Sequence, residues 1–515
     1  MLNKMKLRKI ILLASVVVVF AGCEKVWEDH YNDYPETVDQ NVWEAMQNDS
    51  TVASFVRLLK EYHYDTLFQT KLSYTVFAPT NDALQQFLSI NEVDSTLLKY
   101  HLSTHFIQSG NVEGKRKIRT LSKKYALFEK YGSQAKLDGI LINFESPLYK
   151  NGKFFILNQV DKPIPNLYEF YANNNEILKQ YIDSQDSIVL DNELSTPIGF
   201  DQNGNTIYDT VSYVFNKFEE EYFPVSEEFR NRAATIVFPL KEDYENALTE
   251  MAGNLGNGYT DYRDIPEVWQ QEVLVPFLLK QGVFENKLEP EEFLLKPGER
   301  GPLMLKNILG DSIEISYTPV DKSICSNGYA YNYQNFKVPD SLYSAASRFE
   351  VELLLEQTGI NKYAWGENAV VNSDKPFQPY KEYVASASND TIETVLFPDG
   401  YSGNYSLEFN TQNLFPRKYV MIVNTHMDVG GIYDIYVNDE LVKTFDYYDF
   451  VRYRGIMPSV TGGRYVPTGR FNSFDMYVDN ITEFSKAKIK FVYKGPGNVT
   501  SNGLVLDYID FLPVN

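Results

Sequence analysis

The residues best suited to binding chemistry lie near the end of the chain, between positions 447 and 474. This stretch gathers tyrosines, arginines and one asparagine: Tyr447, Tyr448, Arg452, Tyr453, Arg454, Tyr465, Arg470 and Asn472. Tyrosine rings combine an apolar face with a polar tip, and planar guanidinium groups bond hydroxyls or carboxylates in pairs. Such groups suit sugar rings, so we predict a glycan-binding loop here. The alternative is that the arginines pair with nearby acids or with another domain.

No pattern in the chain indicates catalysis. The sequence has no nucleophile elbow, phosphate loop, zinc spacing or dinucleotide-binding glycines. A glycosidase with paired carboxylates is the enzymatic alternative, but no acid sits in a recognisable motif. The run 201–209 has the Asp-x-Asn-x-Asn spacing of a calcium loop, but its glycine is misplaced and the terminal glutamate is missing. We predict a hairpin turn there, no metal, no cofactor, no catalytic residue, and a protein that is not an enzyme.

Length and charge narrow the class of protein. The 515 residues predict about three domains, and 43% hydrophobic residues are enough for a buried core in each. The net charge of −21 repels phosphate backbones, so we expect no nucleic-acid partner. The same charge argues against docking on anionic lipid. Glycans and cationic partners are compatible with it.

The first 23 residues have the pattern of an export signal. Lys4, Lys6, Arg8 and Lys9 precede the apolar run 10–20, which is too short to cross a bilayer as a helix. Ala21 and Gly22 then precede Cys23, and this resembles the lipobox of bacterial lipoproteins, which implies lipidation of Cys23. The alternative is an ordinary signal peptide with a chance cysteine. The only other cysteine, Cys325, is expected to be a core thiol.

Residues 24–37 are polar, acidic and aromatic, as expected of a tether. Acidic residues soon after the lipidated cysteine resemble the surface-export signal of Bacteroidota lipoproteins. That resemblance implies a location on the outer face of the outer membrane.

Residues 38–175 are predicted to form the first domain. A buried strand, a turn and a helix are expected at 74–84, where Pro79 ends the strand and Thr80 and Asn81 bond the free amides of the helix. A Tyr-His pair and an Asn-Gly turn feeding a strand follow in order. The residues concerned are Thr75, Phe77, Pro79, Thr80 and Asn81, then Tyr100 and His101, then Asn151-Gly152. Together they resemble the fasciclin (FAS1) family, which implies an α+β fold used in adhesion. We favour a structural role for Tyr100 and His101 over a ligand role.

A second, divergent FAS1 copy is predicted at 176–350. Residues 236–244 resemble 75–83, with the proline moved by one place, and residues 274–279 stand where the Tyr-His motif is expected. Asn327-Gly328 lies 176 residues after Asn151-Gly152, and Pro276 lies 176 residues after Tyr100. The common offset indicates an internal repeat.

Residues 351–515 are predicted to form an antiparallel β-sandwich. Strand patterns occur at 406–409, 419–423, 433–437, 441–445, 487–493 and 504–511, separated by turns. The arrangement resembles galactose-binding-like jelly rolls, a group that includes many carbohydrate-binding modules. The fold class is therefore α+β tandem FAS1 domains followed by an all-β C-terminal sandwich.

The sequence favours a surface-exposed outer-membrane lipoprotein that binds a glycan or a partner protein. The layout resembles accessory proteins of Sus-type polysaccharide-uptake systems, which implies a TonB-dependent porin and its lid lipoprotein as partners. The alternative is an adhesive or structural FAS1 protein that binds a protein or matrix partner and no glycan.

Overall fold

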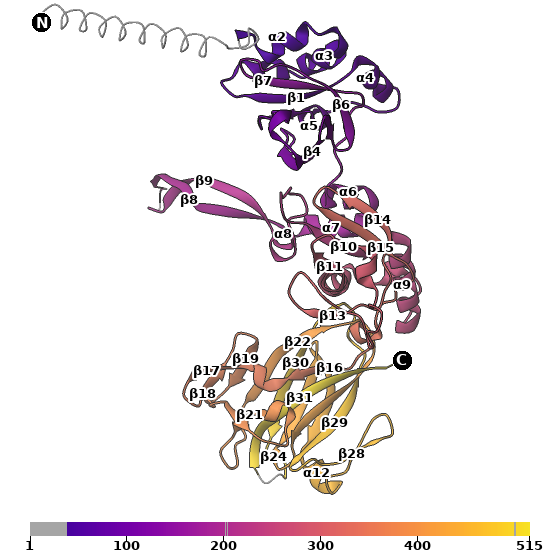
Figure 1. Cartoon of the computed structure of the whole chain (residues 1–515). Coiled ribbons are helices and arrows are strands. Elements are labelled where there is room, and N and C mark those ends of the chain that lie inside the picture. The colour runs from indigo at the N-terminus through magenta and orange to yellow at the C-terminus, as the bar shows by residue number, and fades with distance from the viewer. Residues whose placement is uncertain (1–38, 201, 203, 499–500, 515) are drawn as a thin grey trace, which may run out of the picture. The chain divides into compact units, whose positions relative to one another are not determined.

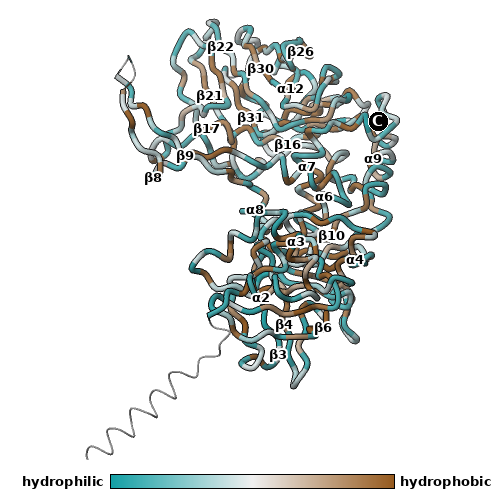
Figure 2. The backbone as a smooth tube through the Cα atoms, turned by 90° about the horizontal axis from the view of Figure 1, so that it is seen from above, coloured by the Kyte–Doolittle hydropathy of each residue, from teal (hydrophilic) through white to brown (hydrophobic). Residues whose placement is uncertain are grey.

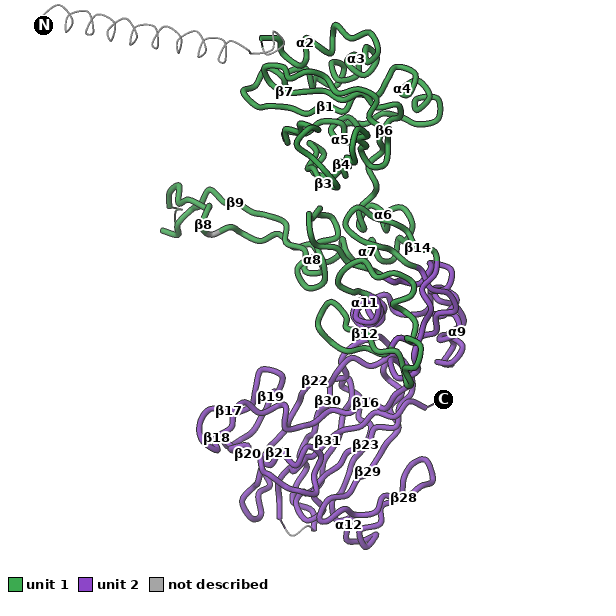
Figure 3. Tube along the Cα trace, viewed as in Figure 1, with its two compact units in different colours: residues 1–236, 283–314, 321–331 green, residues 237–282, 315–320, 332–515 purple. Residues whose placement is uncertain are grey.

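A computed structural model describes residues 39–200, 202, 204–498 and 501–514. Cys23, the export signal at 1–23 and the tether at 24–37 lie outside the described residues. The chain divides into two compact units (Figure 3): one contains 1–236, 283–314 and 321–331, and the other contains 237–282, 315–320 and 332–515. Among the described residues, no helix has the length and apolar character needed to cross a membrane.

The first sheet lies in the first unit and has the strand order β2-β1-β7-β6-β5-β4-β3 (Figure 1). Its strands are β1 (Tyr74–Pro79), β2 (Leu102–Ser103), β3 (Gly114–Arg119), β4 (Tyr125–Tyr131), β5 (Gln134–Leu137), β6 (Ile140–Glu145) and β7 (Gly152–Leu157). Its helices are α2 (Val42–Gln47), α3 (Ala53–Glu61), α4 (Asn81–Leu88) and α5 (Ser95–Tyr100). The strand, turn and helix predicted at 74–84 are confirmed as β1 and α4.

Two clusters of buried side chains hold this sheet together. Every residue of β1 and of β7 is buried, and the two strands run parallel with Tyr74 opposite Gly152. One cluster includes residues of α2 and α3, and the other includes residues of β3, β4 and β5. Parallel strands that are buried on both faces favour apolar runs, which are provided by residues 76–78 of β1 and 154–157 of β7.

A second sheet has the strand order β11-β10-β15-β14. Its strands are β10 (Ala234–Pro239), β11 (Val283–Glu285), β14 (Val320–Cys325) and β15 (Gly328–Tyr333). The helices of this region are α6 (Leu167–Asn174), α7 (Glu176–Ser184), α8 (Lys217–Glu221), α9 (Lys241–Leu255), α10 (Glu267–Trp269) and α11 (Val275–Gly282). Two separate hairpins are formed by β8 (Asp186–Phe200) with β9 (Thr206–Asn216), and by β12 (Met304–Lys306) with β13 (Ser312–Glu314). Cys325 is buried, as expected of a core thiol.

The two Asn-Gly pairs occupy equivalent positions in the two sheets. The Asn151 carbonyl accepts a hydrogen bond from the backbone N–H of Tyr74, and the Asn327 carbonyl accepts one from that of Ala234. The Asn151 side chain accepts from the Val42 N–H at 2.9 Å, and the Asn327 side chain accepts from the Leu167 N–H at 2.9 Å. The amide side chain thus binds the start of a helix in each case. In the second case this helix is α6, which lies within the range predicted for the first domain.

These contacts correct the predicted alignment of the repeat. The Thr75 hydroxyl donates a hydrogen bond to the His105 carbonyl, and the Thr235 hydroxyl donates one to the Asn286 carbonyl. Thr75 therefore corresponds to Thr235, and Pro79 then aligns with Pro239 without the predicted shift of one place. The ladder places Leu102 opposite Val76 and Val283 opposite Ile236. His101 therefore corresponds to Gly282, and the predicted match of Tyr100 with Pro276 is wrong. The sequence alignment failed because the helical segment between β1 and β2 (80–101) is shorter than the one between β10 and β11 (240–282).

The C-terminal sandwich has two sheets with a shared core. One has the order β20-β21-β31-β23-β29, with β16 and β24 also paired to β31, and the other has the order β19-β22-β30-β25-β26. The strands are β16 (Ser347–Glu350), β19 (Ala369–Ser373), β20 (Tyr380–Tyr383), β21 (Thr391–Leu396), β22 (Tyr405–Leu414), β23 (Tyr419–His426), β24 (Val429–Gly430), β25 (Ile432–Val437), β26 (Glu440–Asp446), β29 (Phe471–Val478), β30 (Ser485–Gly495) and β31 (Ser501–Pro513). All six predicted strands are confirmed. Short hairpins are formed by β17 (Leu355–Gly359) with β18 (Lys362–Trp365) and by β27 (Met457–Pro458) with β28 (Arg464–Tyr465).

Candidate functional site

The first fasciclin motif is a structural element of the first sheet. Thr80 is the N-cap of α4 and accepts a hydrogen bond from the Ala83 N–H, as predicted. Asn81 does not cap this helix. Its side chain accepts from the Ser54 N–H at 2.8 Å and donates to the Ser50 carbonyl at 2.7 Å. Asn81 therefore fixes the start of α3 against α4.

Phe77 and Thr75 support the same strand. The Phe77 ring stacks on Phe155 of β7 with a centroid distance of 5.4 Å. The Thr75 hydroxyl donates to the His105 carbonyl at 2.8 Å and accepts from the Ile107 N–H at 3.2 Å. These contacts are internal to the domain, so this motif provides no free binding group.

Tyr100 and His101 are also part of the core. The Tyr100 hydroxyl donates to an Asp138 carboxylate oxygen at 2.6 Å, and His101 Nδ1 lies 2.6 Å from the Phe77 carbonyl. Both side chains are buried. Burial lowers the pKa of His101 to about 4, so the ring is neutral at pH 7. The polar atoms named here are bonded within the domain, which is the arrangement that a structural role requires.

Sequence reasoning missed the two acids that complete this cluster. Asp138 lies in the turn between β5 and β6, and its second oxygen accepts from the Leu127 N–H at 2.8 Å. Burial, the charge of Asp138 and a hydrogen bond to Asp138 raise the pKa of Asp161 to about 8. Burial disfavours the charged form of a carboxyl group, and a neighbouring negative charge adds to this effect. The Asp138-Gly139 dipeptide, a strong turn signal, was the available clue.

Replacing Tyr100 with phenylalanine is expected to destabilise the first domain by about 1.5–3 kcal/mol, because it removes a hydrogen bond to a charged group in a buried site. Urea unfolding of the full chain, with amide exchange of peptides from β4 and β7, measures the change. Tyr131→Phe is the matched control, because Tyr131 is exposed. An equal effect of the two substitutions would contradict this account of the cluster.

The structure corrects three members of the predicted glycan-binding loop. Tyr447 is buried in the sandwich core, with its hydroxyl 2.8 Å from that of Thr425. Asn472 is buried and donates to the backbone carbonyls of Gly455 and Tyr465. The hydroxyl of Tyr465 donates to Asp475 at 2.9 Å. These three side chains hold the loop in place, because their polar atoms are already bonded within the protein.

Asp475 is the residue that organises this loop, and the sequence did not reveal it. Its carboxylate is buried and accepts from the Ser459 hydroxyl at 2.5 Å and from the Val460 N–H at 3.0 Å, in addition to Tyr465. Several donors on one buried carboxylate fix a loop strongly. In the sequence, Asp475 directly follows the loop predicted at 447–474 and belongs to no recognisable motif.

The remaining loop residues form an exposed surface around α12 (Tyr448–Arg452). Arg452 pairs with Asp449 at 2.6 Å and lies over the Tyr448 ring, so the alternative of pairing with nearby acids holds for this arginine. Tyr453, Arg454 and Arg470 are exposed. This part of the loop therefore presents exposed tyrosine and arginine side chains to solvent.

A cavity that the sequence analysis did not predict lies in the second unit. The cavity measures about 540 Å³. Its lining residues are Phe277, Gln281, Ser316, Tyr317, Thr318, Val320, Tyr333, Gln334, Asn335, Phe336, Lys337 and Pro339. They come from α11, from the segment 315–320, and from β15 with the turn after it, so three separate parts of the chain must meet to form the site.

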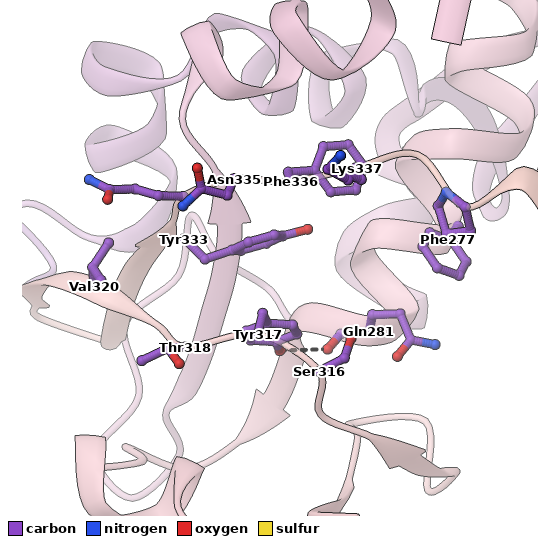
Figure 4. A pocket seen from close by; sticks show the side chains of 12 residues that line it. Phe277, Gln281, Ser316, Tyr317, Thr318, Val320, Tyr333, Asn335, Phe336 and Lys337 are labelled. Carbon is purple, nitrogen blue, oxygen red and sulfur yellow. Dashed lines mark hydrogen bonds between the residues drawn. The ribbon is translucent and has the colours of Figure 1, made fainter. Parts of the chain in front are cut away.

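Aromatic rings line opposite sides of this cavity (Figure 4). Tyr317 and Tyr333 stack with a centroid distance of 4.7 Å, and Phe277 lies across from them. The Tyr317 hydroxyl donates to the Gln281 backbone carbonyl at 2.7 Å, which fixes the ring. The size is typical of small-molecule pockets, which are mostly apolar with a few polar groups.

The polar groups of the cavity are amides, hydroxyls and one ammonium group. No aspartate or glutamate lines it, although the chain carries 69 acids. The side-chain amide of Gln281 makes no hydrogen bond within the described part of the chain and is available to a ligand. Lys337 is paired at 3.0 Å with Glu250, which does not line the cavity. The site therefore suits a neutral, hydroxyl-rich ligand better than a cation.

The described residues contain no group of three or more His, Cys, Asp or Glu side chains placed to hold a metal ion. For the segment 201–209, the two long strands β8 and β9 confirm the predicted hairpin. Asp201 and Asn203 themselves lie outside the described residues.

Comparison with known families identifies the first domain. Residues 50–161 match the Fasciclin domain, so the chain contains a fasciclin domain. No curated protein matches the chain.

Similar solved structures include three carbohydrate-binding modules. A family 35 module from Paenibacillus barcinonensis is 17% identical and covers 33% of this chain and 99% of its own, with a TM-score of 0.19. A family 35 module from Clostridium thermocellum is 14% identical, with coverages of 33% and 99% and a TM-score of 0.19. TmCBM61 in complex with β-1,4-galactotriose is 16% identical, with coverages of 28% and 89% and a TM-score of 0.19.

Proposed function

We propose that this protein is a non-catalytic surface protein that binds a glycan in the cavity between Tyr317 and Phe277. The observation that carries the proposal is the composition of the cavity: aromatic faces on two sides, free amide and hydroxyl groups between them, and no carboxylate. Sugar rings have apolar faces and a rim of hydroxyl groups, so they match aromatic walls and amide partners. A volume of about 540 Å³ accommodates one or two sugar residues.

The two candidate glycan sites can be separated by substitution. We expect Gln281→Ala and Phe277→Ala each to weaken binding of the full chain to its preferred glycan at least tenfold, whereas Tyr453→Ala in the loop at 447–474 leaves binding unchanged. A glycan array selects the ligand, and isothermal titration measures the affinities. Loss of binding only with Tyr453→Ala would move the site to the loop. Absence of binding to every glycan of the array would contradict the proposal.

We also propose that Cys23 carries a lipid that holds the protein at the outer membrane. The basic, apolar and small-residue segments before Cys23 support this. Cys23→Ala is expected to move the protein from the membrane pellet to the soluble fraction and to abolish palmitate labelling. Cys325→Ala is the control, because Cys325 is buried. A Cys23→Ala protein that still sediments with the outer membrane would rule out this anchor.

The proposed setting is a Sus-type polysaccharide-uptake system in a bacterium of the Bacteroidota, with a TonB-dependent porin and its lid lipoprotein as partners. A second candidate function is adhesion to a protein or matrix partner without any glycan. The exposed apolar hairpin β8–β9 favours a protein partner, and it is compatible with glycan binding at a separate site.

A further inference from the structure

The hairpin of β8 and β9 extends away from α8 as a two-stranded arm (Figure 1). The two strands form a sheet of their own, and neither pairs with any other strand among the described residues. An isolated two-stranded hairpin is marginally stable in water, and most native hairpins pack one face on a core or add a third strand. The arm therefore lacks the third strand or the packed face that normally stabilises such a hairpin.

Large apolar side chains are exposed along the whole arm. Hydrophobic positions follow both strands in Figure 2. Between 41% and 78% of the surface is exposed in Ile188, Leu190, Leu194, Ile198, Phe200, Ile207, Tyr208, Val211, Tyr213 and Val214. Scattered exposed apolar residues are ordinary, but a contiguous group of this size marks an interaction site.

The apolar residues occupy both faces of the arm. Ile188 stands opposite Val214 on one face, and Val189 stands opposite Tyr213 on the other. A sheet that docks by one face has polar residues on the other, whereas strands covered on both sides are apolar throughout. The arm therefore fits a cleft that encloses it, and not a flat surface.

The two edges of the arm differ. β8 contains Pro197, and its pairing is interrupted by bulges between Asp191 and Thr196 and between Pro197 and Gly199. Proline and bulges are devices that block edge pairing. β9 has no proline and no lysine to protect its edge. A strand from another protein can therefore extend the sheet along β9.

The charge of the arm identifies the kind of partner. Residues 180–216 contain no lysine, arginine or histidine, and the acids of the arm are Asp186, Asp191, Glu193, Asp201 and Asp209. A second copy would bring equal negative charges together, and anionic lipid would repel the arm as well. A partner with a basic rim would attract it and weaken its binding as salt is added.

We propose that the β8–β9 arm inserts into an apolar cleft of a partner protein whose rim carries lysines and arginines, and that a partner strand pairs with β9. This is β-augmentation combined with burial of both faces. The arm is a binding element separate from the glycan cavity and does not depend on it.

Photo-crosslinking in cells tests the enclosure of both faces. Benzoylphenylalanine is placed in the full chain at Ile188 on one face, at Tyr213 on the other, and at Ile360 as a control that is 90% exposed outside the arm. We expect Ile188 and Tyr213 to crosslink to the same protein, identified by mass spectrometry, and Ile360 not to crosslink to it. Crosslinking from one face only, or from neither, would refute insertion.

Affinity measurements with the purified partner then separate the apolar contribution to binding from the electrostatic contribution. A variant with Ile188→Ser, Leu190→Ser, Tyr213→Ser and Val214→Ser is expected to lose at least tenfold in affinity, whereas Ile360→Ser, Val370→Ser and Leu353→Ser together change it less than twofold. A second variant, Asp191→Lys with Glu193→Lys and Asp209→Lys, keeps the apolar residues. For the native arm we expect affinity to fall at least fivefold between 50 and 500 mM NaCl, and for this variant we expect that dependence to disappear.

Three other binding partners of the arm would give distinct experimental results, and each of these results would overturn the proposal. A second copy would appear as a crosslinked dimer and as a dimer in sedimentation equilibrium. A membrane would appear as co-sedimentation with vesicles of phosphatidylethanolamine and phosphatidylglycerol that Phe200→Ser abolishes. Another part of the same chain would appear as an intramolecular crosslink in the purified monomer.

Discussion

Gly152→Ala is expected to destabilise the fasciclin domain by on the order of 3 kcal/mol or more. A Cβ atom at position 152 would lie 1.8 Å from the Tyr74 carbonyl oxygen, and the backbone there has a φ of +142°, which side-chain-bearing residues rarely adopt. The obstructing atom belongs to the backbone of β1, which lies between β2 and β7 in the sheet. It cannot move without breaking the parallel pairing of β1 with β7. Urea unfolding with amide exchange of β1 and β7 peptides measures the loss.

We expect Gly328→Ala to destabilise the second sheet in the same way. Its Cβ would lie 2.2 Å from the Ala234 carbonyl oxygen, so we expect a loss of similar size there, seen in peptides of β10 and β15. Gly110→Ala is the matched control, because nothing lies within 4 Å of a Cβ at that position. A small effect of Gly152→Ala or Gly328→Ala, similar to that of Gly110→Ala, would show that the close approach of the strands is not required.

The two glycines show how much of the fold the sequence revealed. Both Asn-Gly pairs were identified as turns that feed a strand, and their common spacing indicated a repeat. What could not be predicted is that each asparagine also binds the start of a helix, Asn151 at α2 and Asn327 at α6. Such contacts join segments more than 100 residues apart, so no local pattern encodes them.

The candidate site was predicted less well than the fold. Six strands of the sandwich were identified from local patterns, such as the alternation at 487–493 and the apolar run at 419–423, because such patterns report burial directly. The loop at 447–474 has no period, so the type of residue was the only guide. Tyr447 was selected as a ligand although it is a core residue, and the cavity around Tyr317 was missed. Its walls come from three distant segments, and only the fold brings them together.

The stability of the sandwich is expected to fall as pH rises from about 4 to about 7. Asp507 of β31 is buried, and its carboxylate accepts from the Ser388 N–H at 3.0 Å. Burial has the largest effect, and together with the charges of Glu350 and Glu352 it raises the pKa of Asp507 from 3.8 to about 7. The hydrogen bond from Ser388 and the charge of Arg348 act in the opposite direction and lower this pKa. The folded state therefore holds this proton more tightly than the unfolded chain does.

The sign of the effect follows from proton linkage. Below pH 3.8 both states are protonated, and the group contributes no penalty. Between pH 3.8 and 7 the unfolded chain releases the proton first, so the free energy of unfolding falls as the pH rises. Above pH 7 the whole of this loss in stability is present. At 1.36 kcal/mol per pH unit, a pKa rise from 3.8 to about 7 corresponds to a loss on the order of 4 kcal/mol. Glu393 acts in the same direction, because complete burial raises its pKa well above its ordinary value.

Asp507→Asn is expected to remove the part of this pH dependence that comes from Asp507. The amide oxygen can still accept from the Ser388 N–H, and no charge is buried at pH 8. The variant should therefore be more stable than the native chain by about 2–3 kcal/mol at pH 8 and nearly equal to it at pH 4. Calorimetry of the full chain across this range, with EDTA present to exclude divalent cations, measures both differences.

Asp439→Asn is the control for a general effect of charge. Asp439 is an exposed acid at the turn between β25 and β26, paired with Lys488 at 2.5 Å, and its loss is expected to change stability by less than about 0.5 kcal/mol at either pH. If Asp507→Asn instead destabilises the sandwich at pH 8 in EDTA, the native carboxylate must be charged and compensated within the protein. In that case the protonated state of Asp507 inferred from its burial would be wrong.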